Sequence, residues 1–234
     1  MLEIQDNDYK GTEILKLMRY AKNYNNSVIG LALLNLDIKS GNIIDFGAGI
    51  GTFSSILKSA GFEVTCVEID PKQVKMLEDN GFKTFNDINL IEDNSIENIV
   101  SFNVFEHIKN DVQTLKIIHK KLANDGKLFI FVPASQELYS NFDKKLGHYR
   151  RYEMEGLQNL LKTCGYEILS AQYFDSVGYI LAKIYKFLNI SGGINLVQIQ
   201  IFDKFIFNIS KLLDRIFRKH FGKNIAVTVR KISS

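Results

Sequence analysis

The feature of this sequence that most constrains its fold is a regular alternation of short apolar runs with longer runs of helical spacing. Several of the helix-type runs stop at a glycine, as Gly61, Gly81 and Gly165 illustrate. Alternation of this kind implies βαβ units and a mostly parallel sheet. We therefore expect an α/β fold with seven strands and helices on both faces. The expected strands are 42–46, 63–68, 83–86, 98–103, 127–132, 167–174 and 224–231.

The chain is expected to form one domain over residues 1–234, because 234 residues bury an adequate core without staples. Its 46% hydrophobic and 24% charged residues exclude a disordered chain. We expect four parts within the domain. They are a helical cap at 1–40 with a break near 25–27, a core at 41–175, a helical insertion or lid at 176–221, and the last strand within 222–234, antiparallel at or near the sheet edge.

The charge is divided unevenly along the chain. Residues 1–140 hold 14 Lys and Arg against 19 Asp and Glu, whereas residues 141–234 hold 15 against 7. A basic C-terminal part suits nucleic acid, an anionic membrane surface or an anionic substrate, and it also suits a merely solvated face.

Targeting and metal signals are weak. The first residues have no basic start and no apolar core, and no run approaches the roughly 18 apolar residues of a membrane span. Cys66 and Cys164 form neither a disulfide framework nor a zinc spacing. We therefore expect a cytoplasmic protein without a metal site.

A glycine-rich turn carries the first functional signal. In residues 43–53 an apolar strand leads into Asp45-x-Gly47-x-Gly49-x-Gly51 and then a helix, a place where glycines let a nucleoside approach the backbone. Thr52 stands where the dinucleotide fingerprint requires Gly or Ala. The acid before the turn favours a cationic ligand that carries an amino group.

The second strand ends in another acid, Glu68, 17 residues after Gly51. A carboxylate there accepts the ribose hydroxyls of an adenosine, in a nicotinamide cofactor or in S-adenosylmethionine. This position alone does not separate the two cofactors.

Together these motifs resemble the class I S-adenosylmethionine-dependent methyltransferases, which have a Rossmann-like sheet, over residues 15–175 and 223–231. Residues 98–108 resemble the family's fourth motif, and residues 124–127 depart from the usual Lys-Pro-Gly-Gly. The resemblance implies S-adenosylmethionine as the cofactor and S-adenosylhomocysteine as the product. The cofactor-binding residues that it implies are Asp45, Gly47, Ala48, Gly49, Gly51, Glu68, Ile69, Asp87, Ile88, Asn103 and Val104.

Two further segments, 21–25 and 147–152, resemble a bacterial branch of small-molecule methyltransferases, of types 11 and 12. That branch accompanies polyprenyl-type glycosyltransferases of cell-envelope polysaccharide synthesis. The resemblance implies O- or N-methylation of a small-molecule or sugar- or lipid-linked acceptor.

Methyl transfer to a hydroxyl or a protonated amine needs a base. The catalytic candidates are His107 and His148, with Glu106 contacting the cofactor or orienting a loop. The candidate acceptor-binding residues are Tyr24, His148, Arg150, Arg151 and Tyr152, and the arginine forks suit an anionic group. The alternative for the arginines is a structural pair with an acid such as Asp143 or Glu153.

Other functions fit less well. A nicotinamide-dependent oxidoreductase conflicts with Thr52 and Asp45, and a nucleic-acid methyltransferase conflicts with the 103–106 run, so no nucleic-acid partner is expected. A catalytically inactive S-adenosylmethionine-binding scaffold stays open. The apolar stripe and basic residues of 176–221 suit a lid, a dimer contact or a helix at a membrane interface, so peripheral membrane contact and both a monomer and a homodimer stay open.

Overall fold

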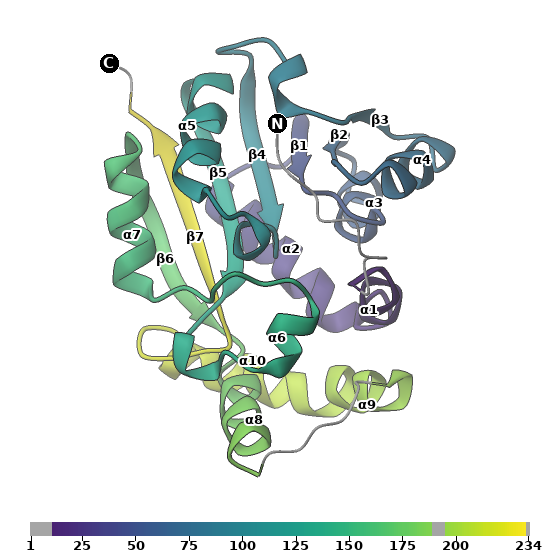
Figure 1. The fold of residues 1–234 in the computed structure, drawn as a ribbon, viewed down its shortest axis with the longest axis vertical. Helices are drawn as coiled ribbons and strands as arrows, with labels where there is room; N and C mark the ends of the chain where they lie inside the picture. The colour runs from purple at the N-terminus through teal and green to yellow at the C-terminus, as the bar shows by residue number, and fades with distance from the viewer. Residues whose placement is uncertain (1–10, 189–194, 233–234) are drawn as a thin grey trace.

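The computed structural model describes residues 11–188 and 195–232 and contains one seven-stranded sheet in the order β3-β2-β1-β4-β5-β7-β6 (Figure 1). Neighbouring strands run parallel except β7, which is antiparallel to both β5 and β6. The predicted sheet is therefore confirmed, with the last strand one place from the edge. The strands are β1 (Asn42–Phe46), β2 (Glu63–Val67), β3 (Lys83–Phe85), β4 (Ile96–Phe102), β5 (Leu122–Pro133), β6 (Tyr166–Phe174) and β7 (Asn224–Lys231).

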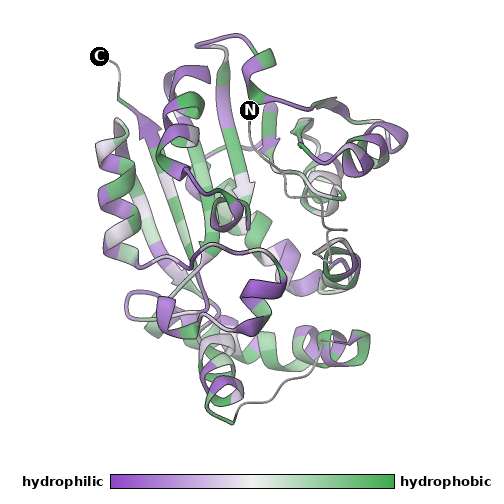
Figure 2. Ribbon diagram, viewed as in Figure 1, coloured by the Kyte–Doolittle hydropathy of each residue, from purple (hydrophilic) through white to green (hydrophobic). Residues whose placement is uncertain are grey.

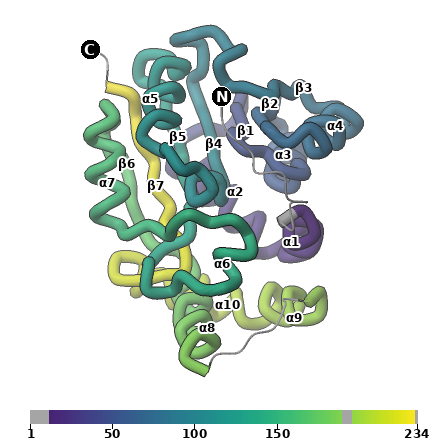
Figure 3. Tube along the Cα trace, in the orientation of Figure 1, coloured from purple at the N-terminus to yellow at the C-terminus, as the bar shows by residue number. Residues whose placement is uncertain are grey.

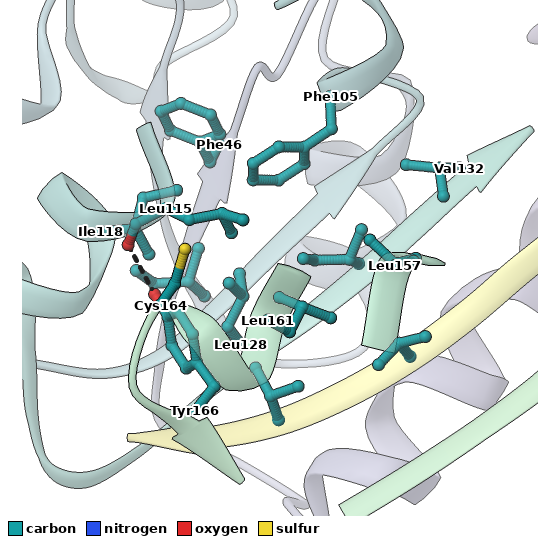
Figure 4. Packing of buried hydrophobic residues seen from close by; sticks show 14 of the residues in the cluster. Phe46, Phe105, Leu115, Ile118, Leu128, Val132, Leu157, Leu161, Cys164 and Tyr166 are labelled. Atoms are coloured by element: carbon teal, nitrogen blue, oxygen red, sulfur yellow. Dashed lines mark hydrogen bonds between the residues drawn. The ribbon is translucent and has the colours of Figure 1, made fainter. Parts of the chain in front are cut away.

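Helices cover both faces of the sheet, and each face has its own apolar cluster (Figure 2). On one face α5 and α7 pack on the strands through Leu115, Ile118, Leu157 and Leu161 (Figure 4). On the other face α2, α3, α4 and the inserted helices supply the apolar side chains. The helices are α1 (Gly11–Met18), α2 (Lys22–Leu36), α3 (Thr52–Ser59), α4 (Pro71–Asp79), α5 (Asp111–Lys121), α6 (Asn141–Lys145), α7 (Met154–Thr163), α8 (Ser176–Phe187), α9 (Leu196–Ile201) and α10 (Phe207–Phe217).

Short 3₁₀ turns complete the connections, and two of them follow the strand ends where the candidate site lies. The 3₁₀ turns are η1 (Ile88–Leu90), η2 (Phe105–His107) and η3 (Gln136–Leu138). A π-helical turn, η4 (Phe202–Ile206), joins α9 to α10.

The break in the N-terminal cap was predicted at the wrong place. Residues 25–27 lie inside α2, and the chain turns between α1 and α2 instead. Asn25 is buried, and its side-chain amide donates to the Met18 carbonyl oxygen at 2.9 Å. The polar residue that suggested a break therefore holds the turn before the helix.

The helical insertion begins and ends at one place in the sheet. The chain leaves β6 at Phe174, passes through α8, α9 and α10, and returns at Asn224, which is the register partner of Phe174 (Figure 3). The backbone N–H of Lys223 donates to the Asp175 carbonyl oxygen at 3.0 Å and closes the insertion at its base.

Candidate active site

The glycine-rich turn follows β1 and adopts backbone angles that favour glycine. Gly47, Gly49 and Gly51 have φ values of +77°, +58° and +76°. The N–H groups of Gly47 and Ala48 donate to the Val67 carbonyl oxygen, which ties the turn to the end of β2. A β-carbon on Gly47 would lie 2.3 Å from a methyl group of Val104. The turn therefore lies directly against Val104, just past the end of β4.

Glu68 lies beside this turn and is almost completely buried. One carboxylate oxygen accepts from the Gly49 N–H at 2.7 Å, and the other accepts from the N–H groups of Ile69 and Asp70 at 2.8 and 3.0 Å. Burial raises the pKa of Glu68, and these backbone donors oppose the shift. A carboxylate has about four acceptor positions, so capacity remains for a ligand hydroxyl.

Asp45 lies behind the turn and not on its surface. It is 1% exposed and accepts from the Ser54 hydroxyl of α3 at 2.5 Å. Burial raises the pKa of Asp45 to about 7, partly offset by the Ser54 hydrogen bond. Asp45 is therefore placed to support the turn from behind and not to contact a ligand directly, which differs from the prediction.

This pKa predicts how stability depends on pH. Because the folded-state pKa of about 7 lies above the roughly 3.9 of an unfolded aspartate, the fold favours protonated Asp45. The contribution of Asp45 to the free energy of unfolding is therefore greatest below about pH 4 and is lost as the pH rises through 7. The slope is at most about 1.4 kcal/mol per pH unit. Asp45→Asn removes the titration, so we expect urea unfolding to show the variant gaining stability relative to wild type between pH 5 and pH 8. Equal pH dependence in both proteins would contradict the prediction.

The ends of β3 and β4 bring the remaining predicted cofactor residues to the same edge of the sheet. The Asp87 carboxylate caps η1 by accepting from the backbone and side-chain nitrogens of Asn89, at 2.9 and 2.8 Å, and Ile88 is buried. Asn103 is exposed at φ +53°, and its N–H donates to the Phe131 carbonyl oxygen at 2.7 Å. All four strand ends therefore meet, as in open α/β sheets that bind ligands there.

The helix α1 closes one side of this edge. The ideal β-carbon of Gly49 would lie 3.3 Å from Leu15, and the Arg19 guanidinium donates to the Ile50 carbonyl oxygen at 3.2 Å. A hollow of about 400 Å³ lies beside the turn, between α2 and α3, and a smaller one of about 290 Å³ adjoins Ile69 and Asn86. The smaller hollow is lined by Ile69 and Asn86, the chain neighbours of Glu68 and Asp87, but neither acid lines either hollow.

Glu106, His107 and His148 come together beyond the end of β4, with their ligand-type atoms all within 4.8 Å of one another. The two imidazole rings meet edge to face, with centroids 4.6 Å apart. Both carboxyl oxygens of Glu106 are buried and have no hydrogen-bond partner in another residue that the structure describes. Burial raises the pKa of Glu106 to about 8, against the effect of its own backbone N–H. Burial and the neighbouring His148 lower the pKa of His107 to about 4, against a hydrogen bond with the backbone of Gly147. At neutral pH the site therefore holds a protonated acid and a neutral imidazole.

Among the residues that the structure describes, Glu106, His107 and His148 are also close enough together to hold a metal ion. The spacing of Cys66 and Cys164 predicts no metal site, but these three residues include no cysteine. That expectation stays a prediction.

His148 is oriented by the buried Asp143, which we expected from the sequence only as a partner for an arginine. Its Nδ1 lies 2.9 Å from Oδ1 of Asp143, which is fully buried. Burial alone would raise the pKa of Asp143, but hydrogen bonds from His148 and the charge of Arg151 outweigh it and hold that pKa well below its ordinary value. Asp143 also completes a capping box with Ser140, and this Ser-x-x-Asp spacing is the signal in the sequence that could have located it.

The two predicted substrate arginines are both engaged with acids. Arg151 forms a forked pair with Asp143 at 2.8 and 3.2 Å, so the structural alternative is the one observed for Arg151. Arg150 donates to Asp111 at 2.7 Å and to the Lys109 carbonyl oxygen at 2.8 Å. The side chain of Arg151 is 9% exposed and that of Arg150 is 31% exposed, so only Arg150 offers a surface to a ligand.

The two predicted substrate tyrosines are mainly structural. Tyr152 is buried and donates to Asp111 at 2.8 Å and to the Phe105 carbonyl oxygen at 3.1 Å. Tyr24 is buried against Phe131, Phe174 and Phe207, and its hydroxyl donates to Asn224 at 3.1 Å. The structure therefore does not present the ring of Tyr24 to a substrate, which differs from the prediction.

The sequence contains a Tyr-x-x-x-Lys pair of the kind used in hydride chemistry, at Tyr179 and Lys183 of α8. Both side chains contact Glu137, and Lys183 does so at 3.1 Å. The pair belongs to the insertion and not to the glycine-rich turn, so it gives the oxidoreductase alternative no support.

Comparison with known proteins agrees with this geometry. The family model described as a methyltransferase domain matches residues 18–171. No curated protein matches the sequence significantly. A SAM-dependent methyltransferase from Archaeoglobus fulgidus aligns with a TM-score of 0.60 at 17% identity, over 88% of this chain and 94% of that one.

Two further solved structures share the fold. Cyclopropane synthase MmaA2 from Mycobacterium tuberculosis gives a TM-score of 0.58 at 15% identity, over 88% of this chain and 83% of that one. A phosphoethanolamine N-methyltransferase from Haemonchus contortus, in complex with phosphomonomethylethanolamine and S-adenosylhomocysteine, gives 0.60 at 17% identity, over 88% of this chain and 53% of that one. These identities support the fold alone. Because the family model covers well over half of its length, the chain belongs to the family of methyltransferase domains.

Proposed function

We propose that this protein transfers a methyl group from S-adenosylmethionine to a small-molecule or sugar- or lipid-linked acceptor. The observation that carries the proposal is the Glu68 carboxylate, held 2.7 Å from the Gly49 N–H inside a turn of left-handed glycines. Such a carboxylate suits the ribose of an adenosine, and the turn suits the amino-acid part. The Archaeoglobus protein, a SAM-dependent methyltransferase, and the Haemonchus enzyme, in complex with S-adenosylhomocysteine, support the same choice.

The residues present fit this cofactor. Glu68 retains acceptor capacity for ribose, and the exposed Asp87 carboxylate is the candidate to meet the adenine. Asp45 lies too deep to contact the ligand and supports the turn from behind. The sulfonium, when bound, supplies an electrophilic methyl group with a good leaving group. The protein's own contribution is then to align the acceptor and to exclude water.

Binding tests the proposal at its first step. Calorimetric titration should show S-adenosylhomocysteine binding and no NAD binding, and Glu68→Ala should weaken the former at least tenfold. Binding of NAD in preference would refute the cofactor assignment. Binding without transfer of label from radioactive S-adenosylmethionine to any acceptor tried would favour the inactive scaffold.

We propose His148 as the base. Asp143 holds its Nδ1, so its Nε2 is left to take a proton from the acceptor, as in other acid-oriented histidines. The neutral His107 beside it adds no competing positive charge. Glu106 is 0% exposed, so its proposed role is to orient the two histidines and their loop and not to contact the acceptor.

His148→Gln is therefore expected to lower kcat by about 10²–10⁴-fold, because general base catalysis contributes that much. The affinity for S-adenosylhomocysteine should not change. The assay follows label from S-adenosylmethionine into lipid-linked and nucleotide-linked sugars. His119→Gln is the matched control, since His119 lies on α5 and contacts the Gly165 carbonyl oxygen, apart from the trio. An unchanged kcat in His148→Gln would exclude the base role.

The acceptor is proposed to carry an anionic group. Arg150 is the better candidate to contact it, because its side chain is more exposed than that of Arg151. A diphosphate sugar from cell-envelope polysaccharide synthesis satisfies this chemistry. A cytoplasmic location and a monomer or homodimer remain part of the same proposal.

A further inference from the structure

The inserted helices carry an apolar stripe that faces outward. Its six residues lie three or four positions apart through α9, η4 and α10, so they share one side of a continuous helical segment. Each is between 50% and 66% exposed. We call this surface the α9–α10 face, and it consists of Val197, Ile201, Phe205, Ile209, Leu212 and Ile216.

This stripe is not needed for packing within the domain. The opposite side of the same segment already fills the interior with Ile199 and Phe207, which are 5% and 0% exposed, and with the buried Asp203 and Ser210. A helix on the surface of a soluble domain normally has one apolar side, and that side faces the core. This segment has two, so the outer one suits a partner.

The exposed charges beside the stripe are all positive within the described part of the insertion. Asp203 is turned inward, where it accepts from the N–H groups of Asn23 and Tyr24 at 3.0 and 2.8 Å. Asp214 accepts from the N–H groups of Asp175 and Ser176 at 2.9 and 2.8 Å. The exposed charged residues of 195–221 are Lys204, Lys211, Arg215, Arg218 and Lys219.

The neighbouring helix extends the apolar character of this face. α8 packs against α10 and ends at Phe187, which, like the following Leu188, is strongly exposed. Its Lys183 pairs with Glu137, and its Lys186 donates to the Tyr139 carbonyl oxygen at 3.1 Å, so the lysines of α8 add little to the free positive charge. Figure 1 places α8, α9 and α10 together at one end of the molecule. None of the helices that the structure describes is long and apolar enough to cross a bilayer.

We propose that the α9–α10 face docks onto the surface of a membrane that contains anionic lipid. Apolar side chains would enter the boundary between headgroups and acyl chains, while the lysines and arginines beside them meet the lipid phosphates. A second copy of this chain fits less well, because a two-fold contact through this face would bring like charges together. The inference does not depend on the proposed methyl transfer.

Vesicle sedimentation tests the proposal. The full chain is mixed with sucrose-loaded vesicles of phosphatidylcholine alone or of phosphatidylcholine with phosphatidylglycerol, at low and high salt. We expect binding to the anionic vesicles that weakens at least tenfold at high salt or with neutral vesicles, because exposed charges are screened. Absence of binding, or equal binding to both vesicle types, would overturn the proposal.

Matched variants locate the surface. Phe205→Ser with Leu212→Ser, and separately Lys211→Glu with Arg215→Glu, should each weaken vesicle binding at least tenfold. Leu34→Ser, which alters a leucine 76% exposed on α2, should leave it unchanged. Circular dichroism and thermal unfolding, run in parallel, show whether each variant keeps its fold without relying on cofactor binding, so this result stays separate from the proposed function. Light scattering that shows a dimer broken by the serine pair, with no vesicle binding, would assign the face to a second copy and refute the membrane.

Discussion

Asp143→Ala is expected to destabilise the fold by about 3–5 kcal/mol, the usual cost of removing one partner of a buried ion pair. Asp143 is fully buried and accepts from Arg151, His148 and Ser140. Without it, the Arg151 guanidinium would remain buried with its Ala134 contact but without a counter-charge. Urea unfolding of the two proteins at one pH measures the difference.

A double variant separates the ion pair from the rest of the cluster. Asp143→Ala combined with Arg151→Leu should be less destabilised than Asp143→Ala alone, because no uncompensated charge is left inside. Arg150→Leu serves as the control, since its pair with Asp111 is more exposed. If the double variant loses as much as the two single variants together, the pair does not act as a unit.

Gly47→Ala is the second change from which we expect a large effect. A β-carbon there would meet Val104 at 2.3 Å, at a backbone φ of +77° that side chains disfavour. The left-handed strain costs about 1–2 kcal/mol and the overpacking about 1–3 kcal/mol, so the fold should lose about 2–5 kcal/mol. Because Val104 would have to move away from the turn, the affinity for S-adenosylhomocysteine should also fall at least tenfold.

Gly61→Ala is the matched control. Gly61 also has a positive φ, +91°, but its β-carbon would meet nothing within 4 Å. Thermal unfolding and calorimetry should show only the smaller backbone cost and an unchanged affinity in this variant. Similar losses in the two variants would mean that contact with Val104 is unimportant.

Much of the fold could be predicted from the sequence because its signals are local. Strand and helix periodicities and glycine stops gave the sheet, and the glycine-rich turn and Glu68 lie together because both follow neighbouring parallel strands. The break in the N-terminal cap was misplaced because Asn25 suggests a turn locally but bonds back to Met18 within the folded helix pair. The type of a polar residue does not predict whether its hydrogen-bond partner lies before or after it in the chain.

Partners that lie far along the chain could not be predicted from the sequence. Asp143, the partner of Arg151, was among the acids expected, but Asp111, the partner of the adjacent Arg150, lies 39 positions away on α5. Likewise, the inward turn of Asp203 toward Asn23 and Tyr24 joins residues about 180 positions apart. Spacing along one helix predicted its apolar stripe but not which of its charges would remain exposed.

The hydrogen-bonded register pair Phe174 and Asn224 has a consequence for how such a protein can diversify. Antiparallel strands meeting at such a pair can be joined by a turn of two residues, and a longer connection costs entropy that grows only slowly with its length. Evolution can therefore replace everything between these residues with another set of helices while the sheet keeps its register. In this architecture the strand ends proposed to receive the cofactor and the helices between Phe174 and Asn224 can therefore change independently of each other in evolution.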